Sequence, residues 1–212
     1  NKGVVDKTKL IQEDYIQTID LDSGGKKNIY FIDKDNIHNN FLQVINQYVN
    51  NEGKRKNRYD VTILVNGFPL VHIELKKRGQ DLREAFNQID RYQRDSFWAG
   101  SGLFEYVQIF VISNGTYTKY YSNTTRELHI NSHSKKVSKT YEFTSFWSDQ
   151  SNNAIIDLLD FAKTFLSKRT ILNIICKYCV FSTDNMLLVM RPYQIVATEK
   201  IINRIEIAHN YK

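Results

Sequence analysis

Two runs of apolar, β-branched residues lie on either side of Asn66-Gly67, between Asp60 and Lys76. An Asn-Gly pair between two such runs is a strong hairpin signal, because both residues tolerate the positive φ that a tight turn needs. The pattern therefore predicts two antiparallel strands. The earlier segment 41–48 is a further strand candidate, and we expect these three strands to form an antiparallel meander.

A helix and two more strands follow the hairpin. Asp81-Leu-Arg-Glu84 has the pattern of a capping box, and apolar residues recur after it at helical spacing, so residues 81–95 are predicted to form an amphipathic helix. Residues 106–112 are almost all apolar, which is typical of a strand buried on both faces, and a turn at Asn114-Gly115 leads into a strand over 116–121. This order of elements predicts an α/β fold with a mixed sheet flanked by helices.

The pattern is weaker outside this region. It predicts a turn at 22–26, a short strand at 28–33 and an exposed loop at 122–138. After Trp147 the character becomes helical, with segments at 153–166, 170–181 and 192–209 and a short apolar stretch at 186–190. We therefore expect one domain over residues 1–148 and a helical segment over residues 149–212.

Composition and charge narrow the possible functions. The chain has 212 residues, of which 42% are hydrophobic and 25% charged, as in a soluble globular protein. No apolar run is long enough to span a membrane and no signal peptide is visible, so we expect a cytoplasmic protein without membrane contact. The chain begins at Asn1 and ends within a helical pattern, from which we expect a fragment of a longer protein.

The net charge of +6 favours anionic partners. Ten Lys and Arg residues against five acidic residues lie between Lys54 and Arg94, around the predicted hairpin, where phosphate groups would need cationic neighbours. The basic turn before Asp60 could equally be an ordinary solvated turn. Cys176 and Cys179 form a C-x-x-C pair without further zinc ligands at finger spacing, and are interpreted as buried, reduced thiols.

The hairpin brings two carboxylates and an ammonium group together. Counting back from the turn sets Asp60 opposite residue 73 or 74, and Glu74 and Lys76 project from the same strand face. Mg²⁺ takes oxygen ligands, which Asp60, Glu74 and the carbonyl of Leu75 could supply, while Lys76 could orient a water or stabilise charge on a phosphate. The alternative is a solvent-exposed Asp and a surface ion pair that contributes little.

These residues carry a resemblance. Arg58-Tyr-Asp60, Val65-Asn-Gly-Phe-Pro-Leu, Ile73-Glu74-Leu-Lys76 and Gln88-x-x-x-Tyr92 resemble the motor (restriction) subunit of type I restriction–modification enzymes. That subunit carries a nuclease domain of the PD-(D/E)xK class ahead of a translocase motor. The resemblance implies a restriction-endonuclease-like fold, Asp60, Glu74 and Lys76 as metal-binding and catalytic residues, and Gln88 and Tyr92 as the motif of the RecB-like branch. Tyr59 stands where the name of the class has a Pro.

The residues around this motif allow two interpretations. Gln88 and Tyr92, at i and i+4, share a helix face that could hold Lys76 or a DNA phosphate, with Arg58 as a further phosphate contact; otherwise they are boundary residues. His72 lies on the same strand face as Glu74, where a lone His more often serves packing than function.

The C-terminal segment has a resemblance of its own. Met190-Arg-Pro-Tyr-Gln194 is similar to the segment that opens superfamily 2 helicase motors, where a Gln recognises the adenine of ATP. This implies Gln194, with Arg191 nearby, as adenine contacts, and a helical segment that leads into a helicase-like domain. No G-x-x-x-x-G-K-[ST] phosphate loop is present in the sequence, so ATP would be used only by the full-length subunit.

The leading hypothesis is thus a Mg²⁺-dependent endonuclease domain of a type I site-specific deoxyribonuclease. It would cut duplex DNA non-specifically after ATP-driven translocation, together with methyltransferase and specificity subunits. One alternative is a stand-alone restriction or repair nuclease of the same class, against which the motor-like C-terminal segment argues. Another is a DNA-binding or docking module that does not cut, against which the presence of Asp60, Glu74 and Lys76 argues.

Overall fold

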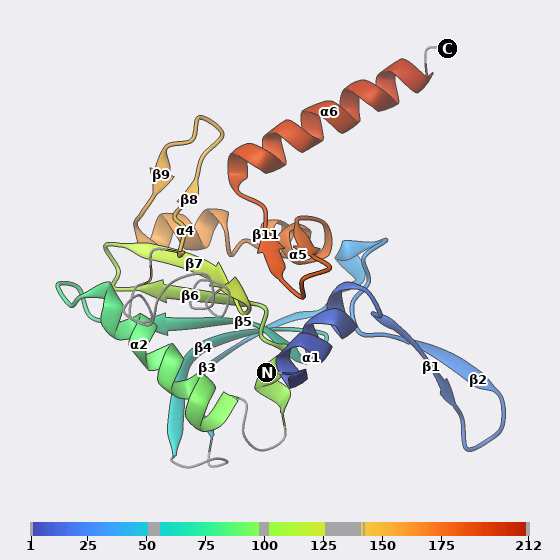
Figure 1. Cartoon of the computed structure of the whole chain (residues 1–212), viewed down its shortest axis with the longest axis horizontal. Helices are drawn as coiled ribbons and strands as arrows, with labels where there is room; N and C mark the ends of the chain where they lie inside the picture. Colours follow the sequence, from blue (N-terminus) through green and yellow to red (C-terminus); the bar gives the residue numbers. More distant parts are fainter. Residues whose placement is uncertain (1, 51–55, 98–101, 126–140, 142, 211–212) are drawn as a thin grey trace.

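The centre of the molecule, in a computed structural model, is a five-stranded mixed sheet in the order β3-β4-β5-β6-β7 (Figure 1). The structure describes residues 2–50, 56–97, 102–125, 141 and 143–210. Four neighbouring pairs join the strands; β5 and β6 run parallel and the other three pairs are antiparallel. The strands are β3 (Leu42–Asn50), β4 (Asn57–Val65), β5 (Phe68–Leu75), β6 (Ile109–Ser113) and β7 (Thr118–Ser122).

The first three strands form the predicted meander. Asn66 and Gly67 have φ of +51° and +88°, so both adopt the left-handed conformation that a tight hairpin turn requires and that a β-branched residue would resist. Helix α2 (Leu82–Tyr92) connects β5 to β6, and the Asp81 side chain caps it by accepting a hydrogen bond from the backbone N–H of Arg83. The π-helical turn η2 (Gln93–Phe97) follows α2 directly.

Helices cover both faces of the sheet. One face packs against α2 through a cluster that includes Tyr59, Phe86, Phe97 and Phe110. The other face packs against α4 (Leu158–Thr164) and α5 (Lys168–Lys177) through apolar side chains of β4, β5 and β6. The sheet is therefore the middle of three layers, and β6 is buried along its whole length, as predicted for a strand covered on both sides.

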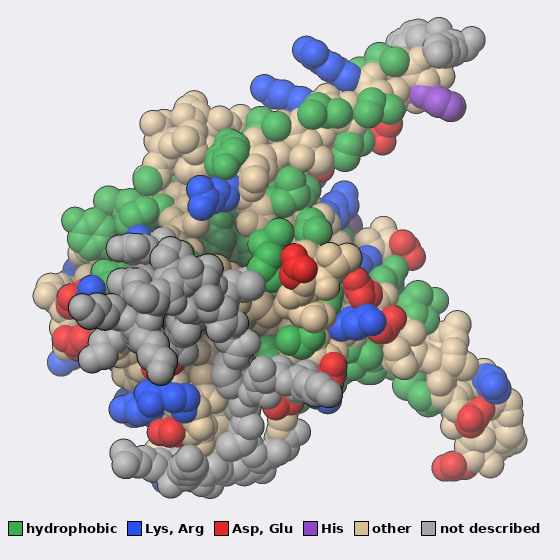
Figure 2. Space-filling view, viewed as in Figure 1, with side chains coloured by type: hydrophobic (Ala, Val, Ile, Leu, Met, Phe, Trp, Pro, Cys, Tyr) green, Lys and Arg blue, Asp and Glu red, His purple; other side chains and the backbone are tan. Residues whose placement is uncertain are grey.

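The remaining elements lie around this core. They are α1 (Lys2–Gln12), β1 (Ile16–Asp20), β2 (Lys26–Tyr30), η1 (Ile37–Asn39), η3 (Leu103–Tyr106), β8 (Trp147–Ser148), β9 (Ala154–Ile155), β10 (Cys179–Phe181), β11 (Leu187–Val189) and α6 (Pro192–Asn210). The β1–β2 ribbon and α6 project from the body of the molecule (Figure 1). Apolar side chains lie exposed along α6, among them Ile201, Ile205 and Ile207 (Figure 2). Within the described ranges, no helix has the length and apolar character needed to cross a membrane.

Several predicted elements differ from the observed ones. The strand expected at 28–33 is shifted to β2, and it pairs with β1 rather than with the sheet. The sequence predicted no element before the turn at 22–26, where α1 and β1 lie. The helix expected at 153–166 begins only after Asp157, whose side chain accepts from the backbone N–H of Leu159 at 2.8 Å. The segment 170–181 is not one helix, because its last three residues form β10.

Two expectations about organisation are left open. Most of the loop predicted at 122–138 lies outside the described residues, as do Lys54 and Arg55 of the basic turn. The division into residues 1–148 and 149–212 stays a prediction. Side chains from both sides of it, such as Val111 and Phe165, belong to the same core cluster.

Candidate functional site

A cleft of about 700 Å³ opens where β4 begins and β5 ends, beside one face of α2. All seven residues predicted for a nuclease site line this cleft: Arg58, Asp60, Glu74, Leu75, Lys76, Gln88 and Tyr92. They come from three elements that are separate in the sequence. The fold thus brings together the whole predicted constellation, and the remaining question is how its members are held.

The pairing of β4 with β5 sets the two carboxylates opposite each other. Next to the turn, Leu64 pairs with Pro69, but a β-bulge between Ile63 and Leu64 shifts the register, so that Val61 pairs with Ile73. Asp60 therefore falls opposite Glu74. Without the bulge it would face residue 73, whose side chain points to the other face of the sheet. Asp60 Oδ2 accepts a hydrogen bond of 2.9 Å from the backbone N–H of Leu75, which fixes the carboxylate at the strand end.

A chain of hydrogen bonds runs from the strand to the helix. Lys76 Nζ lies 3.1 Å from Glu74 Oε1 and also donates to Gln88 Oε1. The Gln88 amide donates to the hydroxyl of Tyr92, which in turn donates to the backbone carbonyl of Arg58 at 2.8 Å. Because Gln88 and Tyr92 are four residues apart, they share the face of α2 that looks at the cleft. Of the two roles considered for this face, the observed contacts are those of a support for Lys76.

Burial distinguishes the groups in the cleft. Glu74 has a fully buried side chain, whereas that of Lys76 is 16% exposed, so a solute reaches Glu74 only after a neighbour such as Lys76 moves. Burial, together with the negative charge of Glu74, raises the pKa of Tyr92 to about 12, which keeps its hydroxyl protonated as a donor. His72 is also fully buried, next to Glu74 on the same strand face.

The donor set suits a hard divalent cation. It comprises two carboxylates, Asp60 and Glu74, beside the backbone of Leu75, and Mg²⁺ in proteins commonly takes one or two carboxylates and completes its shell with water and phosphate oxygens. The Glu74 carboxylate has about four lone-pair sites, and its Oε2 has no hydrogen-bond partner among the described residues. Among the described residues, no three or more His, Cys, Asp or Glu side chains lie close enough together to hold a metal ion. A metal site in this cleft would therefore have few protein ligands, all of them oxygen atoms.

Basic side chains lie around the cleft. Arg58 lines it from β4, Lys56 from just before that strand, Lys77 from just after β5 and Arg91 from α2. Figure 2 shows Lys and Arg side chains over α2. Lys77 and Arg91 belong to the basic surplus of residues 54–94, but the sequence alone does not distinguish them from other surface cations. Only the fold places them at the cleft. Thr62, which contacts His72, carried no signal in the sequence.

The residues predicted to contact adenine lie elsewhere. The backbone N–H of Arg191 donates to Gln194 Oε1 at 2.8 Å, so the Gln194 side chain caps the start of α6. Neither residue lines the cleft beside Asp60 and Glu74. Their role toward ATP stays a prediction.

Comparison with known proteins gives consistent matches. The family model described as "Type I restriction enzyme R protein N terminus" matches residues 1–129. The chain is 50% identical over 204 residues to the type I restriction enzyme EcoprrI endonuclease subunit of Escherichia coli, which is 96% of this chain and 62% of that protein. It is 39% identical over 204 residues to the SsaAORF53P endonuclease subunit of Staphylococcus saprophyticus, 96% of this chain and 20% of that protein. The chain thus spans less than two thirds of either relative.

Proposed function

Because this chain belongs to the family of type I restriction enzyme R protein N termini, we propose that it is the nuclease part of a type I site-specific deoxyribonuclease. Its reaction is the hydrolysis of phosphodiester bonds in duplex DNA. The observation that carries the proposal is the position of the Lys76 ammonium group, which lies 3.1 Å from the buried Glu74 carboxylate in a cleft that Asp60 also lines.

Three oxygen donors would hold Mg²⁺ in this cleft: the carboxylates of Asp60 and Glu74 and the carbonyl of Leu75. When bound, the cation supplies a Lewis acid and lowers the pKa of a water molecule. Lys76 orients the attacking water or stabilises the charge that develops on the phosphate. Gln88 holds Lys76 in place, and Tyr92 ties Gln88 to the backbone of β4.

The substrate is held through its phosphates. Lys56, Arg58, Lys77 and Arg91 border the cleft, and contacts from such cations to phosphates are independent of base sequence. Cleavage is therefore non-specific in itself. Sequence recognition belongs to a specificity subunit, which with a methyltransferase subunit completes the restriction complex.

The second part of the proposal concerns the residues after the sheet. Residues 149–212 lead from the nuclease part, 1–148, into a helicase-like motor of the full-length subunit. There Gln194, with Arg191, contacts the adenine of ATP. Translocation driven by ATP hydrolysis then precedes cleavage.

The test is made in the full-length subunit assembled with its partner subunits, with DNA cleavage and ATP hydrolysis measured separately. Glu74→Gln and Lys76→Met each remove one charge from the cleft, and we expect each to reduce cleavage by at least about a hundredfold while ATP hydrolysis persists. Glu84→Gln is the matched control, because Glu84 lines the same cleft from α2 without contacting Lys76. Cleavage that survives both changes overturns the proposal.

A further inference from the structure

Two buried polar atoms face each other behind the cleft. His72 Nε2 lies 3.6 Å from Glu74 Oε2, and both side chains are fully buried. Neither atom has a hydrogen-bond partner within the described part of the chain. A buried polar atom ordinarily has a hydrogen-bond partner, and here each of the two atoms is the partner available to the other.

The other ring nitrogen indicates which atom carries the proton. Thr62 pairs with His72 across β4 and β5, and its Oγ1 lies 3.3 Å from His72 Nδ1. If the hydroxyl donates to Nδ1, the ring proton is on Nε2 and points at the carboxylate. The reverse arrangement would leave the Nε2 lone pair facing a carboxylate oxygen, two acceptors without a hydrogen between them.

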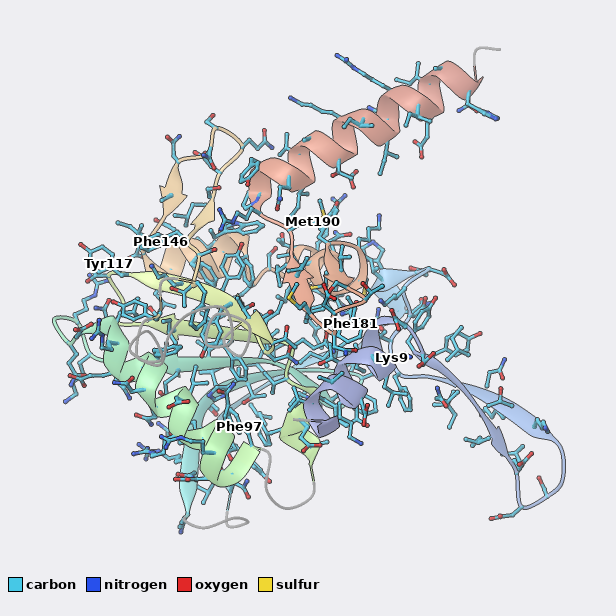
Figure 3. The ribbon with its side chains drawn as sticks, in the orientation of Figure 1. Lys9, Phe97, Tyr117, Phe146, Phe181 and Met190 are labelled. Atoms are coloured by element: carbon cyan, nitrogen blue, oxygen red, sulfur yellow. The ribbon has the colours of Figure 1, made fainter. Side chains whose placement is uncertain are left out.

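Aromatic rings hold the imidazole in this orientation. Phe97, at the end of η2 (Figure 3), packs edge-on against it with centroids 5.0 Å apart. Tyr59 and Tyr92 pack edge-on at 5.7 Å and 6.1 Å. Because the ring is enclosed and close-packed, it has little freedom to turn away from Glu74.

We propose that His72 is a positioning residue for Glu74: its Nε2–H is directed at Oε2, Thr62 fixes that proton, and Lys76 holds Oε1 from the cleft side. A carboxylate has about four lone-pair sites, so two such contacts orient the group and still leave positions for a cation. The inference rests on the proposed function, since it assumes that Glu74 is a metal ligand.

The first test uses the metal-free chain and needs no activity. Long-range ¹H–¹⁵N correlation spectra locate the protons on histidine rings, and the His72 signals are identified by their loss in His72→Gln. We expect a proton on Nε2 of His72. A ring without a proton on Nε2 overturns the proposal.

The second test is calorimetric titration with Mn²⁺. We expect His72→Leu, which removes the donor, to weaken Mn²⁺ affinity about 10- to 100-fold, and His72→Gln, whose amide can still donate, to recover most of it. Should His72→Leu fail to fold, a comparison of Thr62→Val with Thr62→Ser tests the same positioning role through a smaller change in the core. We expect Thr62→Val to weaken affinity and Thr62→Ser to keep it.

The outcomes separate the two proposals. If the wild-type chain does not bind Mn²⁺, or binds it equally well as Glu74→Gln, the proposed metal site itself is overturned. If binding depends on Glu74 but is unchanged in His72→Leu, or in Thr62→Val where that variant replaces it, only the positioning role of His72 is overturned.

Discussion

At the scale of single residues, the Lys76 ammonium group lies between two acceptors from different elements. Its Nζ is 3.1 Å from Glu74 Oε1 on β5 and donates to Gln88 Oε1 on α2. A partly buried ammonium group loses hydration, and these two oxygens replace it. Its position therefore depends on the strand and the helix together. We do not expect Arg to replace Lys76, because its charge is spread over a planar group rather than held on one compact ammonium.

The buried thiols lead to a prediction about pH. Burial raises the pKa of Cys176 from 9.0 to about 11 and that of Cys179 from 9.0 to about 12. Thiols of the unfolded chain therefore ionise first, and the contribution to the free energy of unfolding that is present below pH 9.0 is lost as the pH rises through the folded pKa values. We expect both thiols to resist iodoacetamide at about pH 8 in the folded chain and to react after unfolding, as measured by mass spectrometry.

The double variant Cys176→Ala, Cys179→Ala is the control for this prediction. Its free energy of unfolding, measured by urea denaturation, should depend less on pH above 9.0 than that of the wild type, because the two shifted groups are gone. Rapid alkylation of the folded chain would contradict the account.

The position of Asp60 shows how much of the site could be predicted from the sequence at this scale. The Asn66-Gly67 turn is visible in the sequence, and counting from it left residue 73 or 74 as the partner of Asp60. The bulge between Ile63 and Leu64 places Glu74, not residue 73, opposite Asp60. This bulge could not be predicted from the two apolar runs, because it depends on packing against both layers. Likewise the buried state of His72 depends on aromatic residues far away in the sequence.

At the scale of elements, β3 has an irregularity opposite the cleft. Gln47 has φ of +51°, an unusual conformation for a residue other than glycine. The ladder pairs Asn46 with Val61 and Tyr48 with Tyr59, so Gln47 lies opposite Asp60. Its left-handed backbone coincides with the place where β4 turns Tyr59 into the core and Asp60 toward the cleft. Such backbone strain concentrates at functional sites.

This irregularity can be tested by substitution. We expect Gln47→Val to destabilise the fold by about 1–2 kcal/mol, although Val favours strands, because a β-branched residue resists positive φ. Gln43→Val is the matched control: it is an exposed Gln on the same strand without positive φ and should be neutral or slightly stabilising. Urea denaturation measures both. Equal effects of the two changes would show that the conformation of Gln47 carries no strain.

The segment 170–181 was predicted only in part. Its apolar spacing suits a helix, and a short apolar run cannot by itself distinguish a helix from a strand. The helix α5 ends at Lys177, and Cys179–Phe181 instead pairs with Leu187–Val189 across a turn at Asn185, which has φ of +60°. By contrast α2 was predicted well, because Asp81 provides a local cap.

At the scale of the whole molecule, the helices after the sheet are part of its core. Six side chains from α4, α5 and the turn between them are fully buried in the cluster formed with β4, β5 and β6: Phe161, Phe165, Ile171, Leu172, Ile174 and Ile175. Each contributes about 1.5–3 kcal/mol by burial, and the six together rival the whole stability of a typical domain, about 5–15 kcal/mol. We therefore expect that residues 1–148, even if they are a functional unit, do not fold independently of the helices that follow.

Truncation tests this directly. We expect a chain of residues 1–148 to lack cooperative thermal unfolding and to aggregate, because one apolar face of the sheet is left uncovered. Residues 1–189, which keep α4, α5 and β11 but not the exposed helix α6, should unfold cooperatively in the same calorimetric measurement. Cooperative unfolding of the shorter chain would contradict the three-layer account.

The mixed sheet flanked by helices followed from the order of elements in the sequence, since strand, strand, strand, helix, strand, strand leaves few packing solutions. The packing of α4 and α5 on the face of the sheet away from α2, which makes the third layer, did not follow. The division near residue 149 was placed at a change of pattern, from strands to helices, and such a change carries no information about which surfaces pack together.

The central claim is that a divalent cation binds in the cleft where β4 begins and β5 ends, and that DNA is cut there. The most direct measurement is anomalous diffraction from crystals of this chain soaked in Mn²⁺. The account predicts a peak coordinated by Asp60, Glu74 and the carbonyl of Leu75, with Lys76 beside it, and no such peak in Glu74→Gln. A wild-type crystal with no peak in this cleft, or with its peak elsewhere, would contradict it.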